Sequence, residues 1–222
     1  MNQIATRDKP SLLKTFGERY EIEPANVMSV LKKTAFSTVR DITNEQMISL
    51  LAVANEYNLN PFTKEIYAFS NGEGIVPIVG VDGWITMINR QAQFDGVEFR
   101  TSDTTVEVGG VTCCEWMEAV IYRKDLTHPI IVREYFKEVF RNKNNWKQQP
   151  MRMLRHRALI QCARVAFGFS GIYDPDEGRN IIEATAKPQS NGTKVYETKA
   201  DALSDALDGV VFDEDTGEIA NE

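Results

Sequence analysis

Four arginines and one histidine are concentrated between residues 150 and 169, where no acidic residue occurs: Arg152, Arg155, His156, Arg157 and Arg164. On a solvated helix, acidic and basic side chains usually alternate at spacings of three and four, because such pairs stabilise each other. At about 100° per residue, Arg157 and Arg164 share one helix face and Arg152 and Arg155 share another. We therefore expect a negatively charged group outside the chain to meet these guanidinium groups.

The same segment is predicted to form one helix over residues 150–169. Pro150 suits a first helical turn, and no glycine interrupts the segment before Gly168. An apolar stripe on the remaining face is expected to pack on a core, and it consists of Leu154, Ala158 and Val165.

The charge of the chain is distributed unevenly. The net charge of −7 by itself argues against a nucleic-acid partner. Residues 121–164, however, carry eleven Lys and Arg against three Asp and Glu, whereas residues 187–222 carry nine acidic residues against three lysines. We call residues 121–164 the basic band, and its charge favours a polyanionic ligand.

Composition predicts one sizeable domain followed by a tail. With 222 residues, 42% of them hydrophobic, the chain can bury a core in residues 1–186, and the acidic residues 187–222 are expected to be a flexible tail. Three cysteines provide no disulfide framework and no zinc-ligand spacing. No apolar run reaches 18 residues and the first ten residues show no signal core, so a cytoplasmic protein is expected.

A run of strands enclosed by helices predicts an α+β fold with a small antiparallel sheet, built of hairpins or a meander and flanked by helices. Residues 1–22 are weakly patterned. The tail is interpreted either as a solvated extension or as the carrier of a docking segment for another protein at residues 202–212, with at most a short amphipathic helix at 202–207. Thr43 and Gln46 form a capping-box pattern, and Asp82 is placed to cap a helix. The helices expected near the core are 25–36, 44–58 and 82–90, and the strands are 65–69, 75–81, 97–100, 104–108, 111–123 and 130–135.

The sequence lacks the residues that several classes of enzyme require. No G-x-x-x-x-G-K-[ST] loop is present for nucleotide hydrolysis. A metal-dependent nuclease needs converging carboxylates, and the basic band holds only Asp125, Glu134 and Glu138, which suit surface ion pairs better. His128 and His156 each lack a neighbouring nucleophile, and burial among arginines should keep His156 neutral. We expect no catalytic residue and no metal site, with a nuclease as the main alternative.

Single-stranded nucleic acid requires cations along its phosphates and aromatic planes for its bases. The basic band supplies both at residues 122–124, 133–137 and 141–147. Trp146 lies in the polar segment NKNNWKQQ, where it either stacks on a base or anchors the loop on the core or on a neighbouring subunit.

Five segments closely resemble the Bet branch of the RecT-type phage recombinases: LNPFTKEIYAF (59–69), GIVPIVGVDGW (74–84), FDGVEF (94–99), IYRKDLTHPI (121–130) and RMLRHRALIQCARVAFGFSGIYD (152–174). The resemblance runs from about Leu31 to about Ala184. It implies ATP-independent annealing of complementary DNA strands, assembly into rings or helical filaments, and life in a bacterial host as a phage or prophage protein. It also implies two partners, a phage 5′–3′ exonuclease and the host single-stranded-DNA-binding protein. The tail after Lys187 is too short and acidic for the partner-binding domain expected of the nearest relatives.

The resulting hypothesis is a DNA-annealing protein rather than an enzyme, with a plain single-strand-binding protein as a further alternative. Its partners are single-stranded DNA, the annealed duplex and other copies of the chain, without a membrane. No cofactor and no ATP are expected, with a divalent cation at most modulating annealing. The predicted DNA-binding residues are Lys64, Arg123, Lys124, Lys137, Trp146, Lys147, Arg152, Arg155, Arg157 and Arg164.

Overall fold

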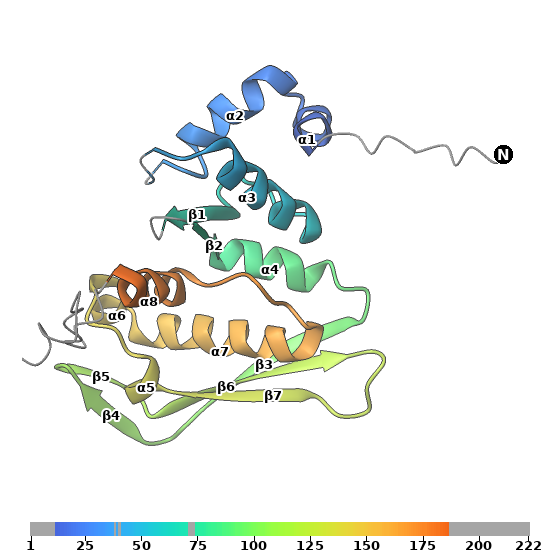
Figure 1. Ribbon diagram of the computed structural model, residues 1–222. Helices are drawn as coiled ribbons and strands as arrows, with labels where there is room; N and C mark the ends of the chain where they lie inside the picture. The colour runs from blue at the N-terminus through green and yellow to red at the C-terminus, as the bar shows by residue number, and fades with distance from the viewer. Residues whose placement is uncertain (1–11, 38, 40, 71–73, 187–222) are drawn as a thin grey trace, which may run out of the picture. The chain divides into compact units, whose positions relative to one another are not determined.

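The computed structural model describes residues 12–186 except 38, 40 and 71–73 (Figure 1). The structure divides into a unit of residues 1–186 and a unit of residues 187–222. The second unit lies outside the described residues, and so does the helix predicted at 202–207.

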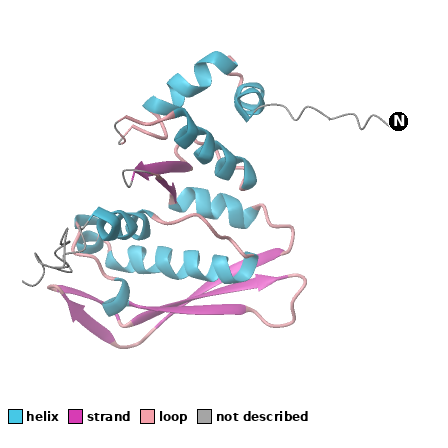
Figure 2. Cartoon of the chain, viewed as in Figure 1, coloured by secondary structure: helices cyan, strands magenta, loops and turns pink. Residues whose placement is uncertain are grey.

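Helices and strands alternate in blocks along the chain, and the predicted α+β fold class is confirmed (Figure 2). The helices are α1 (Leu12–Tyr20), α2 (Pro24–Lys33), α3 (Asn44–Glu56), α4 (Val81–Asn89), α5 (Phe136–Val139), α6 (Asn144–Gln148), α7 (Pro150–Phe167) and α8 (Pro175–Ala186). The strands are β1 (Ile66–Ser70), β2 (Ile75–Val79), β3 (Phe94–Thr101), β4 (Thr105–Val108), β5 (Val111–Cys114), β6 (Trp116–Arg123) and β7 (Ile130–Tyr135).

Local signals explain where the N-terminal helices begin. Helix α3 starts with the predicted capping box, in which the Thr43 hydroxyl accepts from the Gln46 amide at 3.2 Å and the Gln46 side chain accepts from the Thr43 amide at 3.1 Å. Helix α1 was not predicted, but it forms because its Phe16 side chain is fully buried. At helix α4, the N-cap is Gly80, and the predicted cap Asp82 lies in the first turn without a capping hydrogen bond.

The strands form three antiparallel sheets instead of one meander: β1–β2, β3–β6–β7 and β4–β5. The predicted strand 111–123 was wrong, because the chain breaks at Glu115 between β5 and β6. There the Glu115 amide donates to the Thr104 carbonyl at 3.0 Å, and the Thr104 hydroxyl donates to the Glu115 carboxylate at 2.7 Å. The predicted turn at Gly109 and Gly110 is confirmed, with φ of 58° and 75°, a conformation that favours glycine.

Helix α7 packs along the β3–β6–β7 sheet (Figure 1). Its start at Pro150 is confirmed, and it ends where Gly168 adopts φ of 73°. Leu154 and Ala158 are buried as predicted, but Val165 is 67% exposed. The Cys162 thiol donates to the carbonyl of Ile130, the first residue of β7. The next turn of the helix, which carries Val165, therefore extends past the end of that strand.

After α7 the chain returns to the β1–β2 hairpin. Tyr173 pairs with Ile78 of β2 in a parallel bridge, and the Val79 amide donates to the Tyr173 carbonyl at 2.8 Å. Helix α8 then packs against both strands of the hairpin. The segment that follows α7 is therefore fixed by backbone hydrogen bonds to a hairpin nearly one hundred residues earlier in the sequence.

Candidate nucleic-acid interface

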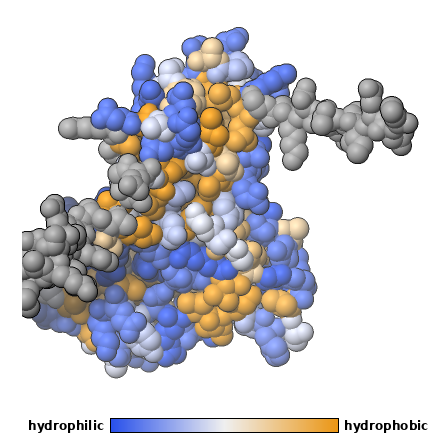
Figure 3. Space-filling model, in the orientation of Figure 1, coloured by the Kyte–Doolittle hydropathy of each residue, from blue (hydrophilic) through white to orange (hydrophobic). Residues whose placement is uncertain are grey.

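Six of the nine predicted DNA-binding cations are exposed and form no ion pair with any described residue: Lys64, Lys124, Lys137, Lys147, Arg152 and Arg155. Lys147, Arg152 and Arg155 lie close together in sequence, on α6 and the first turns of α7. The Arg155 guanidinium lies 5.7 Å from the centre of the Phe99 ring of β3, which holds one face of the group while its donors stay accessible. Hydrophilic residues dominate the visible surface over α7 (Figure 3).

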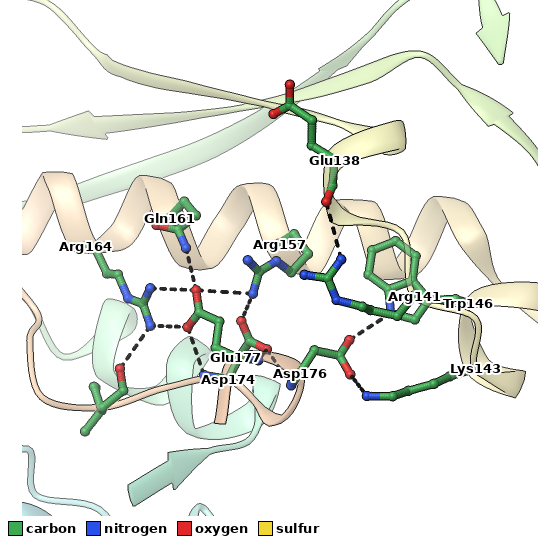
Figure 4. A network of polar contacts seen from close by, with 11 residues as sticks. Glu138, Arg141, Lys143, Trp146, Arg157, Gln161, Arg164, Asp174, Asp176 and Glu177 are labelled. Atoms are coloured by element: carbon green, nitrogen blue, oxygen red, sulfur yellow. Dashed lines mark hydrogen bonds and ion pairs between the residues drawn. The ribbon is translucent and has the colours of Figure 1, made fainter. Parts of the chain in front are cut away.

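Arg157 and Arg164, on the predicted common face of α7, are engaged inside the chain (Figure 4). Arg157 forms ion pairs with Asp174 and, at 3.3 Å, with Glu177. Arg164 reaches the same Glu177 carboxylate at 2.6 Å, and the Gln161 amide donates to it at 2.8 Å. The Arg157 and Arg164 side chains are 14% and 21% exposed, so both are largely removed from water.

From the sequence we expected the negative charge to come from outside the chain. For these two arginines it comes from Asp174, directly before α8, and from Glu177 in the first turn of α8. Asp174 also caps α8, since its carboxylate accepts from the amides of Asp176 at 2.7 Å and Glu177 at 3.1 Å. Removing one partner of such a buried pair leaves an uncompensated charge. The network therefore holds α8 on α7, and contact between these arginines and DNA stays a prediction.

Arg123 has a similar structural engagement. Its Nε donates to Asp125 at 2.9 Å, and another of its nitrogens donates to the Ala166 carbonyl near the end of α7. Its guanidinium lies 5.8 Å from the centre of the Phe167 ring. Arg123 thus joins the end of β6 to the end of α7, with 19% of its side chain exposed.

Trp146 is fully buried and belongs to the core. Its indole N–H donates to the Asp176 carboxylate at 2.8 Å, and Lys143 forms an ion pair with the same carboxylate at 2.9 Å. The rings of Phe136 and Phe140 lie 6.2 Å and 6.1 Å from the indole, centre to centre. Of the alternatives left open by the sequence, the structure shows an anchor on the core. Stacking on a base would require this side chain to leave its site.

The pKa values of Asp176 and His156 are both lowered, for different physical reasons. Burial by itself would raise the pKa of Asp176, but hydrogen bonds from Trp146 and Lys143 outweigh it and lower that pKa. Burial, then the charges of Arg152 and Arg155, lower the pKa of His156. The prediction that His156 stays neutral is confirmed.

The acidic partners of the arginines were missed because they lie outside the basic band. A usable signal was present, since Asp174 and Glu177 have the spacing of a helix capping box ahead of α8. Among the described residues, no three His, Cys, Asp or Glu side chains are grouped to hold a metal ion. Over the same residues, no helix combines the length and apolar character that would let it cross a bilayer.

The model of the RecT family matches residues 23–189. The chain belongs to the RecT family, which confirms the resemblance found in the sequence. Over 176 residues it is 47% identical to "Recombination protein bet" of Escherichia phage lambda. The matched region covers 74% of this chain and 62% of that relative, so the chain spans less than two thirds of the relative's length.

Proposed function

We propose that this chain is a phage-type single-strand annealing protein, which binds single-stranded DNA and promotes pairing of complementary strands without ATP. Membership of the RecT family and similarity to a recombination protein support this function. The observation that carries it is the group of exposed cations Lys147, Arg152 and Arg155, which has no acidic partner in the described structure. Arg123, Arg157 and Arg164 form ion pairs with acidic residues of the chain, whereas these three exposed cations are available to phosphates.

In this mechanism, the exposed cations neutralise the phosphates of one strand and release its counterions. Phosphate contacts fix the position of the strand without reading its sequence, so its base edges stay free. A second strand is then selected by Watson–Crick pairing. The protein contributes by holding many nucleotides aligned along an assembly of subunits. No covalent step and no catalytic residue are needed, and a divalent cation acts at most as a modulator.

The side chains that are engaged inside the protein have a different role in the proposal. Arg123, Arg157, Arg164 and Trp146 position the helices that carry the exposed cations. Direct phosphate contacts belong to the exposed residues, which also include Lys64, Lys124 and Lys137.

The proposal also covers assembly and cellular context. Residues 1–186 would bind DNA and assemble into rings or filaments in the cytoplasm of a bacterial host, and residues 187–222 would be dispensable for annealing. A phage exonuclease and the host single-stranded-DNA-binding protein are the proposed partners. A chain shortened to residues 1–186 should anneal bare oligonucleotides as the full chain does, and loss of annealing would show that the tail belongs to the working core.

The decisive experiment mixes the purified full chain with complementary oligonucleotides in the absence of ATP. Accelerated duplex formation supports the proposal. Shortened products would identify a nuclease instead, and strands held apart would identify a plain single-strand-binding protein.

The double variant Arg152→Ala/Arg155→Ala should lower the salt dependence of binding by about 1.4 in log–log slope, at about 0.7 per phosphate contact on single strands. The control Lys14→Ala/Lys33→Ala, which removes two positive charges from α1 and α2, should leave it unchanged.

A further inference from the structure

A second cationic site lies outside the basic band. A cavity of about 350 Å³ opens between the end of α2, strand β1 and helix α8. We call it the Arg179 pocket, and its lining includes Thr34, Ser37, Lys64, Tyr67, Phe69 and Arg179. These residues provide two cations, two aromatic rings and the hydroxyl groups of Thr34 and Ser37 besides that of the tyrosine. No carboxylate is among the described residues that line it.

The two cations of the pocket are available to a ligand. Lys64 and Arg179 are both exposed, and neither forms an ion pair with another described residue. Two acidic residues close to these cations in sequence, Glu65 and Asp176, are engaged elsewhere. Glu65 accepts from the Asn60 amide at 2.9 Å, and Asp176 is held by Lys143 and Trp146.

Close packing fixes the position of Arg179. A Cβ atom at Gly178 would lie 1.9 Å from Cδ1 of Ile78, so only glycine lets α8 approach the hairpin this closely. The next residue is Arg179, whose guanidinium lies 5.7 Å from the centre of the Phe69 ring. This cation–π contact orients the group beside the cavity and leaves its N–H donors unpaired within the described structure.

Tyr67 supplies a neutral donor at the same place. Its ring packs edge-on against Phe69 at 5.7 Å, and its hydroxyl makes no hydrogen bond to any described residue. Burial raises the pKa of Tyr67 although the charge of Arg179 opposes the shift, so the phenol keeps its proton at neutral pH.

Lys64 comes from a turn with its own fixed geometry. The Asn60 side chain accepts from the Phe62 amide at 2.9 Å, and the Glu65 amide donates to the Asn60 carbonyl at 3.1 Å. Lys64 itself has φ of 64°, in the left-handed region. The backbone positions of Lys64 and Arg179 are therefore both fixed by the fold before any ligand binds.

We propose that the Arg179 pocket binds a phosphodiester group of single-stranded DNA, with Lys64 and Arg179 on the phosphate and Tyr67 donating to it or packing against the adjoining nucleotide. An arginine fork can hold two phosphate oxygens at once, and a lysine adds a compact charge. The inference rests on the proposed function and extends the path of the strand to α8 and the β1–β2 hairpin, beyond residues 121–164.

The test uses the full chain, oligothymidylate, and salt titrations of binding. Arg179→Ala should reduce the affinity and lower the log–log salt slope by about 0.7, the value for one phosphate contact on a single strand. Arg179→Lys should restore the slope but only part of the affinity, because lysine cannot form the fork. Lys14→Ala, an equal loss of charge on α1 outside the pocket lining, should change neither quantity.

A double-mutant cycle adds a criterion for a shared phosphate. If Lys64 and Arg179 hold the same group, the loss of affinity in Lys64→Ala/Arg179→Ala should be smaller than the product of the two single losses. Fully multiplicative losses would show that they contact separate phosphates and would overturn the proposed site.

Three further outcomes are distinguishable. If the unchanged chain does not bind oligothymidylate, the proposed function fails. If it binds and Arg179→Ala binds with the same slope and affinity, only the pocket is refuted. Should thymidine monophosphate bind the unchanged chain as tightly as the oligonucleotide, and bind Arg179→Ala more weakly, the pocket takes a free nucleotide and the strand assignment is overturned. Circular dichroism of each variant checks that a loss of binding is not caused by unfolding.

Discussion

Arg157→Ala should destabilise the protein strongly, because it removes the partner of a buried carboxylate. The Asp174 side chain is only 5% exposed, and without Arg157 it keeps just its backbone donors. Breaking a buried ion pair on one side costs about 3–5 kcal/mol. We expect a loss near the lower end, about 3 kcal/mol, since two amide donors still stabilise the carboxylate and Glu177 keeps Arg164.

Urea unfolding at neutral pH measures this loss, with Arg152→Ala as the matched control. Arg152 is exposed and has no ion pair among the described residues, so its replacement should change stability by no more than about 0.5 kcal/mol. Arg157→Ala/Asp174→Asn should recover part of the loss, because asparagine still caps α8 and carries no charge. A loss below about 1 kcal/mol for Arg157→Ala, or no recovery in the double variant, would refute a structural network.

Three further predictions concern the same region. Lys147→Ala should lower the salt slope of single-strand binding by about 0.7 without altering the urea midpoint, and an unchanged slope would remove this residue from the interface. Trp146→Phe should lower the free energy of unfolding by about 1–3 kcal/mol, because Asp176 loses a buried hydrogen bond; a urea midpoint equal to that of the unchanged chain would contradict this. Because folding lowers the pKa of Asp176, its carboxylate stabilises the folded state above a pH of about 4, and this stabilisation is lost as pH falls through the folded pKa. Trp146→Phe should therefore also move acid unfolding to higher pH. Because folding lowers the pKa of His156, the unfolded chain binds more protons than the folded chain below a pH of about 6.5. The free energy of unfolding should therefore decrease as pH decreases in that range, and His156→Gln should weaken this pH dependence.

Local features could be predicted from the sequence because their causes lie within a few residues. The capping box at Thr43, the turn at Gly109 and the start of the long helix at Pro150 all depend on neighbours in the chain. Strand β7 was predicted with the bounds that the structure shows. The break at Glu115 was missed because hydrogen bonds to Thr104, eleven residues earlier, produce it.

The candidate site was harder to predict from the sequence, because tertiary contacts decide which arginines form ion pairs with carboxylates. Helical periodicity separated Arg157 and Arg164 from Arg152 and Arg155, but it could not show which pair meets carboxylates. That depends on α8 returning alongside α7, which brings Glu177 within 2.6 Å of Arg164. The burial of Trp146 likewise depends on Asp176, thirty residues further on. The sequence left open whether Trp146 anchors the loop or stacks on a base, and the structure shows the anchor on the core.

The ion pairs between α7 and α8 also bear on how the protein is made. Helix α7 leaves the ribosome before Asp174 and Glu177 have emerged, so during that interval Arg157 and Arg164 carry charges without their native partners. A nascent chain at this stage presents an unusually basic helix, which is open to ribosomal RNA or other polyanions until α8 docks. Any shortened version that ends before Glu177 would stay permanently in that condition, and its affinity for nucleic acid would report exposed arginines rather than the native surface.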